Sequence, residues 1–297
     1  RDLLSRLTVP KVRAFQDDLA EAGRSAAMIR RVTASLGAIL AEAQERGLVN
    51  RNVVRELSRK RGGLAGGRAS RRHKKKLEIG VDIPTPDEIK AITSCLAGRY
   101  RPVILTAIFT GLRASEIRGI RWSDIDFGKA CLHVRQRADR YDVLGSLKSR
   151  AAIRTVPLPP IVLHTLKEWR QHCPNGESKL VFPNGRGNVE SLANIINRGL
   201  VPPQLAAGVI VPGSKMAENG EPVQKAKYTG MHSLRHFYAS WLINRKQDGG
   251  LELPLKIVQE RMGHSSIVMT MDVYGHLFPQ KDSASELEAA QIALLGE

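Results

Sequence analysis

Residues 232–241 have the sequence HSLRHFYASW. Its apolar residues recur at helical spacing, so we predict a helix from about His232 to Ile243. His232 and Arg235 are three residues apart and therefore project from one face of that helix. An arginine can donate two parallel hydrogen bonds to a phosphate, so this face is suited to bind an anion.

Four further stretches place polar residues in contexts suited to the same task. They are TGLRASEIRGIRW (110–122), LKSRAAIRTVPL (147–158), MGHSS (262–266) and TMDVYGHLF (270–278), with Arg113, Lys148, His264 and Tyr274 as the candidate residues. Cleavage of a phosphodiester adds negative charge to its non-bridging oxygens, which Arg113 and Arg235 can stabilise from two sides. A phenol such as Tyr274 attacks phosphorus when cations or a base promote loss of its proton. Lys148, in a turn between strands, can protonate the leaving 5′ oxygen.

Each candidate taken alone also has a structural interpretation. Arg113 can pair with Glu116 one turn further along, a lone histidine is more often structural than catalytic, and a tyrosine is usually a buried aromatic. Lys148 can be a plain phosphate contact. His232 and His236 also form an HxxxH pair at zinc-ligand spacing, but the glutamate that follows the first histidine in metallohydrolases is missing and no third ligand is evident.

The charge balance points to a polyanionic partner. The 297 residues include 46 Lys and Arg but only 29 Asp and Glu, which gives a formal net charge of +17. Double-stranded DNA is the expected partner. Membrane-surface binding is disfavoured because no helix pairs a basic face with an apolar aromatic one.

Nothing in the sequence predicts a metal ion or another cofactor. The three cysteines, Cys95, Cys131 and Cys173, are odd in number and lack C-x-x-C spacing, which favours neither a disulfide framework nor a zinc site. No apolar run is long enough to span a bilayer and no secretory signal is visible, so we expect a cytoplasmic protein. The first residue is Arg1 rather than Met, and we expect further residues upstream.

The chain is expected to form two domains joined by a basic linker. Residues 1–60 have only helical periodicity, with caps and stops at Thr8, Gly23, Ser25, Gly47 and Asn50 or Asn52. Residues 61–83 combine paired glycines with clustered cations and form either a strap along DNA phosphates or a disordered tract. The cations expected to bind DNA there are Arg68, Arg71, Arg72, Lys74, Lys75 and Lys76.

Residues 84–297 are predicted to form the second domain, which is mainly α with a small antiparallel β-sheet, an α+β fold. Thr85 can cap its first helix, and a final amphipathic helix is expected over residues 284–295. The segments CLHVRQR, YDVLGSLK and AIRTVPL alternate in polarity and are predicted to form the sheet, and KLVFP a short strand. Residues 199–229 are rich in Pro, Gly and Lys and are predicted to be an irregular insertion.

Taken together and in order, these motifs resemble those of the tyrosine recombinase, or phage integrase, family, most closely the integrases of phages and genomic islands. The resemblance covers nearly the whole chain. It implies a helical core-binding domain at residues 1–60 and a catalytic domain at residues 84–297. It further implies that Arg113, Lys148, His232, Arg235 and His264 activate the scissile phosphate, that Tyr274 forms a 3′-phosphotyrosyl bond, and that Glu116 orients Arg113.

The resemblance also implies partners and leaves alternatives open. A site-specific recombinase that cleaves and rejoins DNA without ATP or metal would assemble as a homotetramer on paired sites, with the last helix packing onto a neighbouring subunit. A DNA-bending protein and an excision factor are possible helpers. The alternatives are a topoisomerase IB-like or hairpin-resolving strand transferase and, in another class, a non-catalytic DNA-binding regulator. An arm-binding domain, the target sequence and the role of residues 199–229 stay open.

Overall fold

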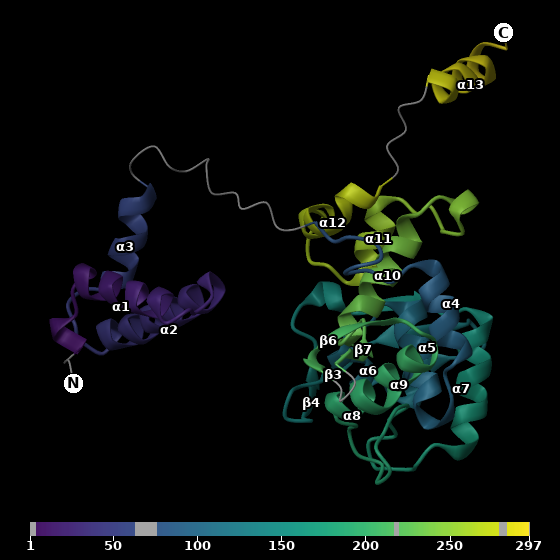
Figure 1. Cartoon of the computed structure of the whole chain (residues 1–297), viewed down its shortest axis with the longest axis horizontal. Coiled ribbons are helices and arrows are strands. Elements are labelled where there is room, and N and C mark those ends of the chain that lie inside the picture. Colours follow the sequence, from purple (N-terminus) through teal and green to yellow (C-terminus); the bar gives the residue numbers. More distant parts are fainter. Residues whose placement is uncertain (1–3, 63–75, 217–219, 279–283, 297) are drawn as a thin grey trace. The chain divides into compact units, whose positions relative to one another are not determined.

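The computed structural model describes residues 4–62, 76–216, 220–278 and 284–296 of the chain. The chain divides into two compact units, Arg1–Lys74 and Lys75–Glu297. Figure 1 colours the first unit purple to blue and the second blue to yellow. Five of the linker cations expected to bind DNA, Arg68, Arg71, Arg72, Lys74 and Lys75, lie outside the described residues, and the sixth, Lys76, is exposed.

The α-helices in the described part of the first unit are α1 (Val9–Glu21), α2 (Ala26–Glu45) and α3 (Val53–Gly62). The predicted caps are confirmed, because Thr8 Oγ1 accepts a hydrogen bond from Lys11 N and Ser25 Oγ accepts one from Met28 N. Asn52, rather than Asn50, caps α3 through the backbone N–H of Val54. The small core of this unit consists of Val12, Leu40, Ala43, Val49, Val53 and Leu57.

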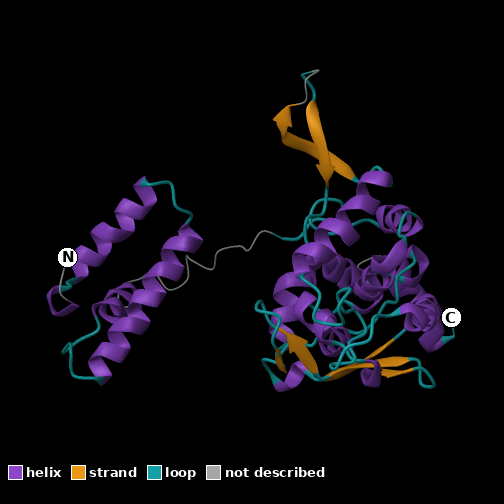
Figure 2. Cartoon of the chain, turned by 90° about the horizontal axis from the view of Figure 1, so that it is seen from below, coloured by secondary structure: helices purple, strands orange, loops and turns teal. Residues whose placement is uncertain are grey.

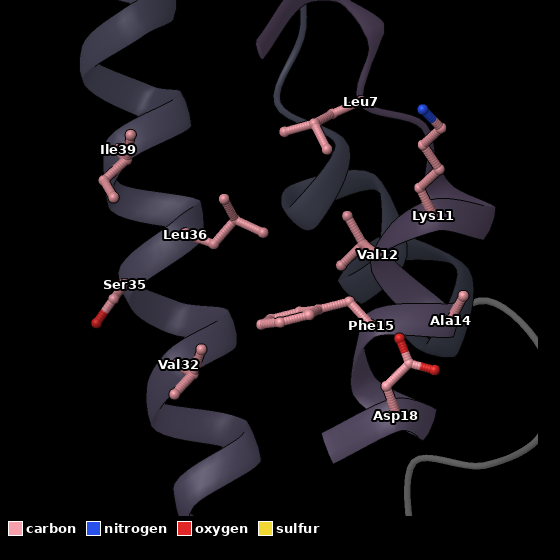
Figure 3. A pocket seen from close by; sticks show the side chains of 10 residues that line it. All are labelled: Leu7, Lys11, Val12, Ala14, Phe15, Asp18, Val32, Ser35, Leu36 and Ile39. Atoms are coloured by element: carbon pink, nitrogen blue, oxygen red, sulfur yellow. The ribbon is translucent and has the colours of Figure 1, made fainter. Parts of the chain in front are cut away.

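An apolar groove of about 590 Å³ runs between α1 and α2. Figure 3 shows the side chains of Phe15 and Leu36 extending from these two helices toward one another. Phe15 is 39% exposed and Ile39 55% exposed, so the helices leave apolar surface open to solvent. None of the residues predicted for phosphodiester chemistry lines this groove.

The second unit is mostly helical. Its α-helices are α4 (Pro86–Ser94), α5 (Arg101–Thr110), α6 (Ala114–Gly119), α7 (Pro160–His172), α8 (Leu192–Asn194), α9 (Val201–Ala206), α10 (Met231–Ile243), α11 (Leu255–Met262), α12 (Ile267–Tyr274) and α13 (Ala284–Leu295). Thr85 forms the predicted capping box with Glu88 at the start of α4. Nearly every side chain of α5 is buried, and the helix packs against α10 and α7 at the centre of the hydrophobic core.

Within the described residues, the strands form three small antiparallel sheets rather than the single one that we predicted. They are β1 (Ile125–Asp126), β2 (Cys131–Val134), β3 (Gln136–Ala138), β4 (Leu144–Ser146), β5 (Arg154–Pro157), β6 (Ile210–Met216) and β7 (Pro222–Ala226), paired in the orders β1-β2-β5, β3-β4 and β6-β7. The chain leaves the first sheet after β2, and β3 packs against α6. This close approach requires Gly119, because a Cβ there would lie 2.8 Å from the Arg137 backbone.

Two other local predictions were wrong. Within residues 199–229, predicted to be irregular, α9 is followed by the β6–β7 hairpin, which Figure 2 shows extending away from the helices of the second unit. Most of its side chains are exposed, so its strands lack the apolar alternation that would have identified them. The segment KLVFP makes only isolated bridges, through Leu180 and Pro183.

The fold class is α+β, as predicted. Helices dominate both units, and the described strands are short and antiparallel. Among the described residues, no helix combines the length and the apolarity needed to cross a membrane.

Candidate functional site

The site begins at a buried carboxylate between two arginines. Arg113 is the N-cap residue of α6, and Glu116 accepts a hydrogen bond from the Arg113 backbone N–H at 2.9 Å. The Arg113 side chain pairs with Glu116 at 2.8 Å, so the ion pair considered from the sequence exists. Arg113 nevertheless stays 34% exposed while Glu116 is 2% exposed, which leaves the guanidinium accessible from one side.

The second arginine, Arg154, was missed by the sequence analysis. It begins β5, is buried, and contacts Glu116 at 2.9 Å. It also donates to the carbonyl oxygen of Arg261 at 2.8 Å, which joins β5 to α11. Burial alone would raise the pKa of Glu116, but the charges and hydrogen bonds of Arg154 and Arg113 outweigh it and lower that pKa. In the sequence, the signal that could have identified Arg154 was its inward-facing position on a predicted strand.

Arg235 lies on α10 in the interior and is 2% exposed. Its Nη1 donates to the carbonyl oxygen of Gly111 and its Nη2 to that of Met262, both at 2.5 Å. Burial first, and then repulsion from Arg113, lowers the pKa of Arg235 to about 9. Arg113 donates to Gly263, the residue after Met262, at 3.3 Å. The two predicted arginines, Arg235 and Arg113, therefore donate to the carbonyl oxygens of two consecutive residues.

His264 receives a hydrogen bond from Arg235. Arg235 Nη2 lies 3.1 Å from His264 Nε2, and because arginine can only donate, Nε2 must be the acceptor. Nδ1 then carries the proton and donates it to Thr270 Oγ1 at 2.9 Å. Burial, reinforced by the neighbouring charge of Arg235, lowers the pKa of His264 to about 4. The imidazole is therefore neutral at neutral pH.

Tyr274 ends α12 with its side chain buried at 2% exposure. Its ring lies parallel to that of His264, with centroids 6.3 Å apart, and its hydroxyl lies 2.8 Å from His236 Nδ1. Burial raises the pKa of Tyr274 to about 12, although the charges of Arg235 and Arg113 act in the opposite direction. The hydroxyl is thus protonated and can donate to His236, whose pKa burial lowers to about 4.

The last two predicted residues, His232 and Lys148, lie at the surface of this cluster. His232 is exposed, and its ring meets that of His236 edge to face at 4.9 Å. Partial burial and the charges of Arg235 and Arg113 lower the pKa of His232. Lys148 is exposed and lines a cavity of about 290 Å³ together with Arg113. Among the described residues, His232 and His236 belong to no group of three metal-ligand side chains, so the HxxxH zinc interpretation gains no support.

The arrangement concentrates positive charge. Arg113 and Arg154 both pair with the buried carboxylate of Glu116, and Arg235 lies near enough for that charge to act on it. Burial first, and then the charges of the neighbouring arginines, lower the pKa of His232 and of His264. A site with such an excess of fixed cations and hydrogen-bond donors is suited to an anion, and a phenol lies beside it.

The chain matches the phage integrase family over residues 85–281. It therefore belongs to this family, the tyrosine recombinases, as the sequence motifs predicted. A protein named tyrosine recombinase XerC-like, from Caldanaerobacter subterraneus subsp. tengcongensis, is 31% identical over 227 residues, which cover 71% of this chain and 54% of that protein. The prophage integrase IntR of Escherichia coli K12 is 26% identical over 214 residues, which cover 68% of this chain and 49% of that protein. The chain thus spans about half the length of these two relatives.

Solved structures of integrases share the fold. The Tn1549 transposon integrase, solved in complex with a circular intermediate DNA, matches with a TM-score of 0.64 at 18% identity, over 98% of this chain and 86% of that one. A lambda integrase dimer bound to a COC′ core site matches with a TM-score of 0.55 at 17% identity, over 95% and 83% of the two chains. At such low identity the likeness establishes the architecture alone.

Proposed function

We propose that this chain is a site-specific DNA recombinase that cleaves and rejoins strands through a 3′-phosphotyrosyl bond at Tyr274. The observation that carries the proposal is the cluster of Arg113, Arg154 and Arg235 near Glu116. Two of these cations, Arg235 and Arg113, lie close enough to the Tyr274 phenol to lower its pKa against the effect of burial. A scissile phosphate is the anion that both the cations and the nucleophile suit.

Arg113 and Arg235 would hold the non-bridging oxygens of that phosphate. The described residues accept hydrogen bonds from Nη1 and Nη2 of Arg235, but none accepts from its Nε, which therefore remains for an anion. The carbonyls of Gly111 and Met262 fix the guanidinium in place before the phosphate arrives. Glu116 and Arg154 would act indirectly, by orienting Arg113.

In the proposed reaction the Tyr274 oxygen forms a bond to phosphorus and the bond from phosphorus to the 5′ oxygen breaks. Lys148 protonates the departing 5′ oxygen, and the phenol proton passes to His236 Nδ1, which already faces the hydroxyl. A bound phosphate offsets the charge of Arg235, one cause of the low pKa of His236, and so makes this histidine a better base. His232 would donate a hydrogen bond to the phosphate group, and His264 would act through Arg235, whose Nη2 it accepts from and holds in place.

Because Tyr274 is 2% exposed, its phenol must turn out of the buried position before it can reach a phosphate. The phosphotyrosyl bond conserves the energy of the broken linkage, so a 5′ hydroxyl can reseal the strand with no other energy source. Rejoining to a different 5′ end exchanges strands between two DNA sites.

Double-stranded DNA is the proposed partner, in keeping with the net charge of +17 and with the DNA bound in the solved structures of the Tn1549 and lambda integrases. Residues 1–60 would be the helical core-binding domain, 61–83 the linker along DNA phosphates, and 84–297 the catalytic domain. Strand exchange between two sites calls for a homotetramer, with a DNA-bending protein and an excision factor as helpers. The proposed place of action is the cytoplasm.

The test uses DNA selected from genomic fragments by binding to the full chain. A duplex of this sequence, nicked near the cleavage position, loses the short fragment that carries the 5′ hydroxyl and traps the covalent complex. The wild-type chain should become covalently attached to DNA, and Tyr274→Phe should bind the duplex with no attachment. Tyr141→Phe is the matched control, since Tyr141 is 68% exposed and lies outside the cluster, and it should behave as wild type.

Attachment of DNA by Tyr274→Phe would show that the nucleophile is another residue. If neither chain attaches DNA although both bind it, the chain is a DNA-binding protein without this chemistry, and the proposal fails. Recombination between two duplexes, measured with the same DNA, separates a recombinase from a strand transferase that acts on one site.

A further inference from the structure

A second group of chemically reactive side chains lies away from the arginine cluster, on the β1–β2 strand pair. Asp126, Cys131 and His133 each offer one ligand atom, and these atoms all lie within 4.8 Å of one another. The residues have no part in the proposed DNA chemistry. A carboxylate, a thiol and an imidazole together form a ligand set that suits zinc better than it suits magnesium or calcium.

Strand pairing explains how the three side chains meet. Asp126 of β1 lies directly opposite Cys131 of β2 in the antiparallel register. Cys131 and His133 are two residues apart on β2, so their side chains project from the same face of the sheet. The sequence spacing alone concealed this group, because the metal-ligand pattern forms only when the turn brings β1 against β2.

The imidazole of His133 is oriented as a metal ligand would need to be. His133 Nδ1 lies 2.9 Å from Thr155 Oγ1 on β5, and with Nδ1–H donating to that oxygen, Nε2 carries the free lone pair. Nε2 lies 3.9 Å from Cys131 Sγ. Metal-bound histidines commonly donate their other N–H in this way, which fixes both the tautomer and the ring orientation.

Asp126 is likewise held in place. Its Oδ1 accepts hydrogen bonds from the backbone N–H groups of Lys129 at 2.8 Å and Gly128 at 3.0 Å. These bonds, that of Lys129 above all, lower the pKa of the carboxyl. No described residue donates to its Oδ2, so that oxygen remains for a ligand.

The spacing is compatible with a tetrahedral zinc ion. Zn–S and Zn–N bonds of about 2.3 and 2.0 Å place the sulfur and nitrogen about 3.5 Å apart at a tetrahedral angle, so the 3.9 Å separation needs only a small adjustment. We propose that Asp126, Cys131 and His133 bind one zinc ion, with water in the fourth position. Thiolate and carboxylate would then neutralise the ion's two positive charges.

The proposed ion would reinforce the β1-β2-β5 sheet. Thr155, which positions His133, follows Arg154 on β5, the arginine that contacts Glu116. Zinc would therefore hold together the strands that support this arginine, without contacting the proposed DNA site. The inference is independent of the proposed recombinase activity.

The test uses the metal-free full chain with cobalt(II) as a spectroscopic probe for zinc. One cobalt ion per chain should bind with the absorption of a thiolate-to-cobalt charge transfer, and zinc should displace it. Cys131→Ser should lose this absorption, and His133→Gln should weaken cobalt binding at least about tenfold. Cys173→Ser, which removes a cysteine outside the group, is the matched control and should bind as wild type. Zinc should raise the thermal unfolding midpoint of the wild type and of Cys173→Ser but not that of Cys131→Ser.

The proposal is overturned if the wild type shows no thiolate absorption with cobalt, or if Cys131→Ser retains it. Loss of the absorption in Cys173→Ser would show that the metal binds at Cys173 instead, and it would also overturn the proposal. Circular dichroism of the metal-free variants separates lost binding from lost folding. If Cys131→Ser proves unfolded, protection of Cys131 from alkylation by zinc in the wild type, read by mass spectrometry of peptides, decides the question, and equal alkylation with and without zinc overturns it.

Discussion

At the scale of single residues, the site depends on Glu116 more than its indirect role suggests. Its carboxylate is the buried counter-charge of both Arg113 and Arg154, and each contact is shorter than 3 Å. A buried ion pair adds little net stability, but removal of one partner leaves a charge in the interior without compensation. Glu116 therefore does not act on the phosphate itself, but the local structure requires its negative charge.

Glu116→Gln should lower the free energy of unfolding by roughly 3–5 kcal/mol, measured by urea denaturation. The control is Glu168→Gln, because Glu168 is 58% exposed and lies 4.0 Å from Arg101. A surface pair of this kind is worth less than about 1 kcal/mol. Equal losses in the two variants would show that Glu116 does not hold the arginines together.

At the scale of elements, the α11–α12 connection aligns the site. α11 ends at Met262, whose carbonyl accepts from Arg235, and the next two residues are Gly263 and His264. Gly263 has a φ of +63°, and a Cβ there would lie 2.8 Å from Nη1 of Arg154. The turn therefore requires glycine both for its left-handed backbone and for the room that the arginine occupies.

Gly263→Ala is expected to displace Arg154 and to reduce covalent DNA attachment in the nicked-duplex assay at least about tenfold, because a misplacement of about 1 Å can cost a hundredfold. Gly208→Ala is the matched control: its φ is +69° and nothing lies within 4 Å of the added Cβ. Both substitutions should cost about 1–2 kcal/mol of stability through backbone strain. Unchanged attachment in Gly263→Ala would contradict the supporting role of this turn.

At the scale of the whole molecule, two histidines make stability depend on pH. The pKa values of His236 and His264 are about 4 in the folded chain, against an ordinary value of 6.5. The unfolded chain therefore takes up protons first as the pH falls, and the stability present above pH 6.5 is lost as the pH falls to about 4. For His264, which is 7% exposed, the loss is at most about 3 kcal/mol.

The thermal unfolding midpoint should fall between pH 7 and pH 4.5, and more steeply than in His264→Gln, which lacks one titrating group. His164→Gln provides the control, since the His164 side chain is 77% exposed and lies outside the arginine cluster. Differential scanning calorimetry across this pH range measures the effect. A midpoint that stays constant, or an equal slope in wild type and His264→Gln, would argue against neutral buried histidines.

Several features of the fold were determined by the sequence itself. Thr8, Ser25 and Thr85 cap helices as predicted, because a cap bonds to backbone groups only three residues away. The motifs also predicted the family and the α+β class correctly. The catalytic roles given to the six motif residues stay predictions that the DNA-attachment assay addresses.

The tertiary structure decided what depends on contacts between distant segments. The adjacency of Arg113 and Arg235, the insertion of Arg154 beside Glu116 and the bond between His236 and Tyr274 join residues separated by 38 positions or more along the chain. The splitting of the sheet at β3 and the meeting of Asp126 with Cys131 follow from strand pairing, which local composition does not encode. Short-range hydrogen bonds can be inferred from neighbouring residues, whereas the convergence of charges and metal ligands exists only once the core has packed.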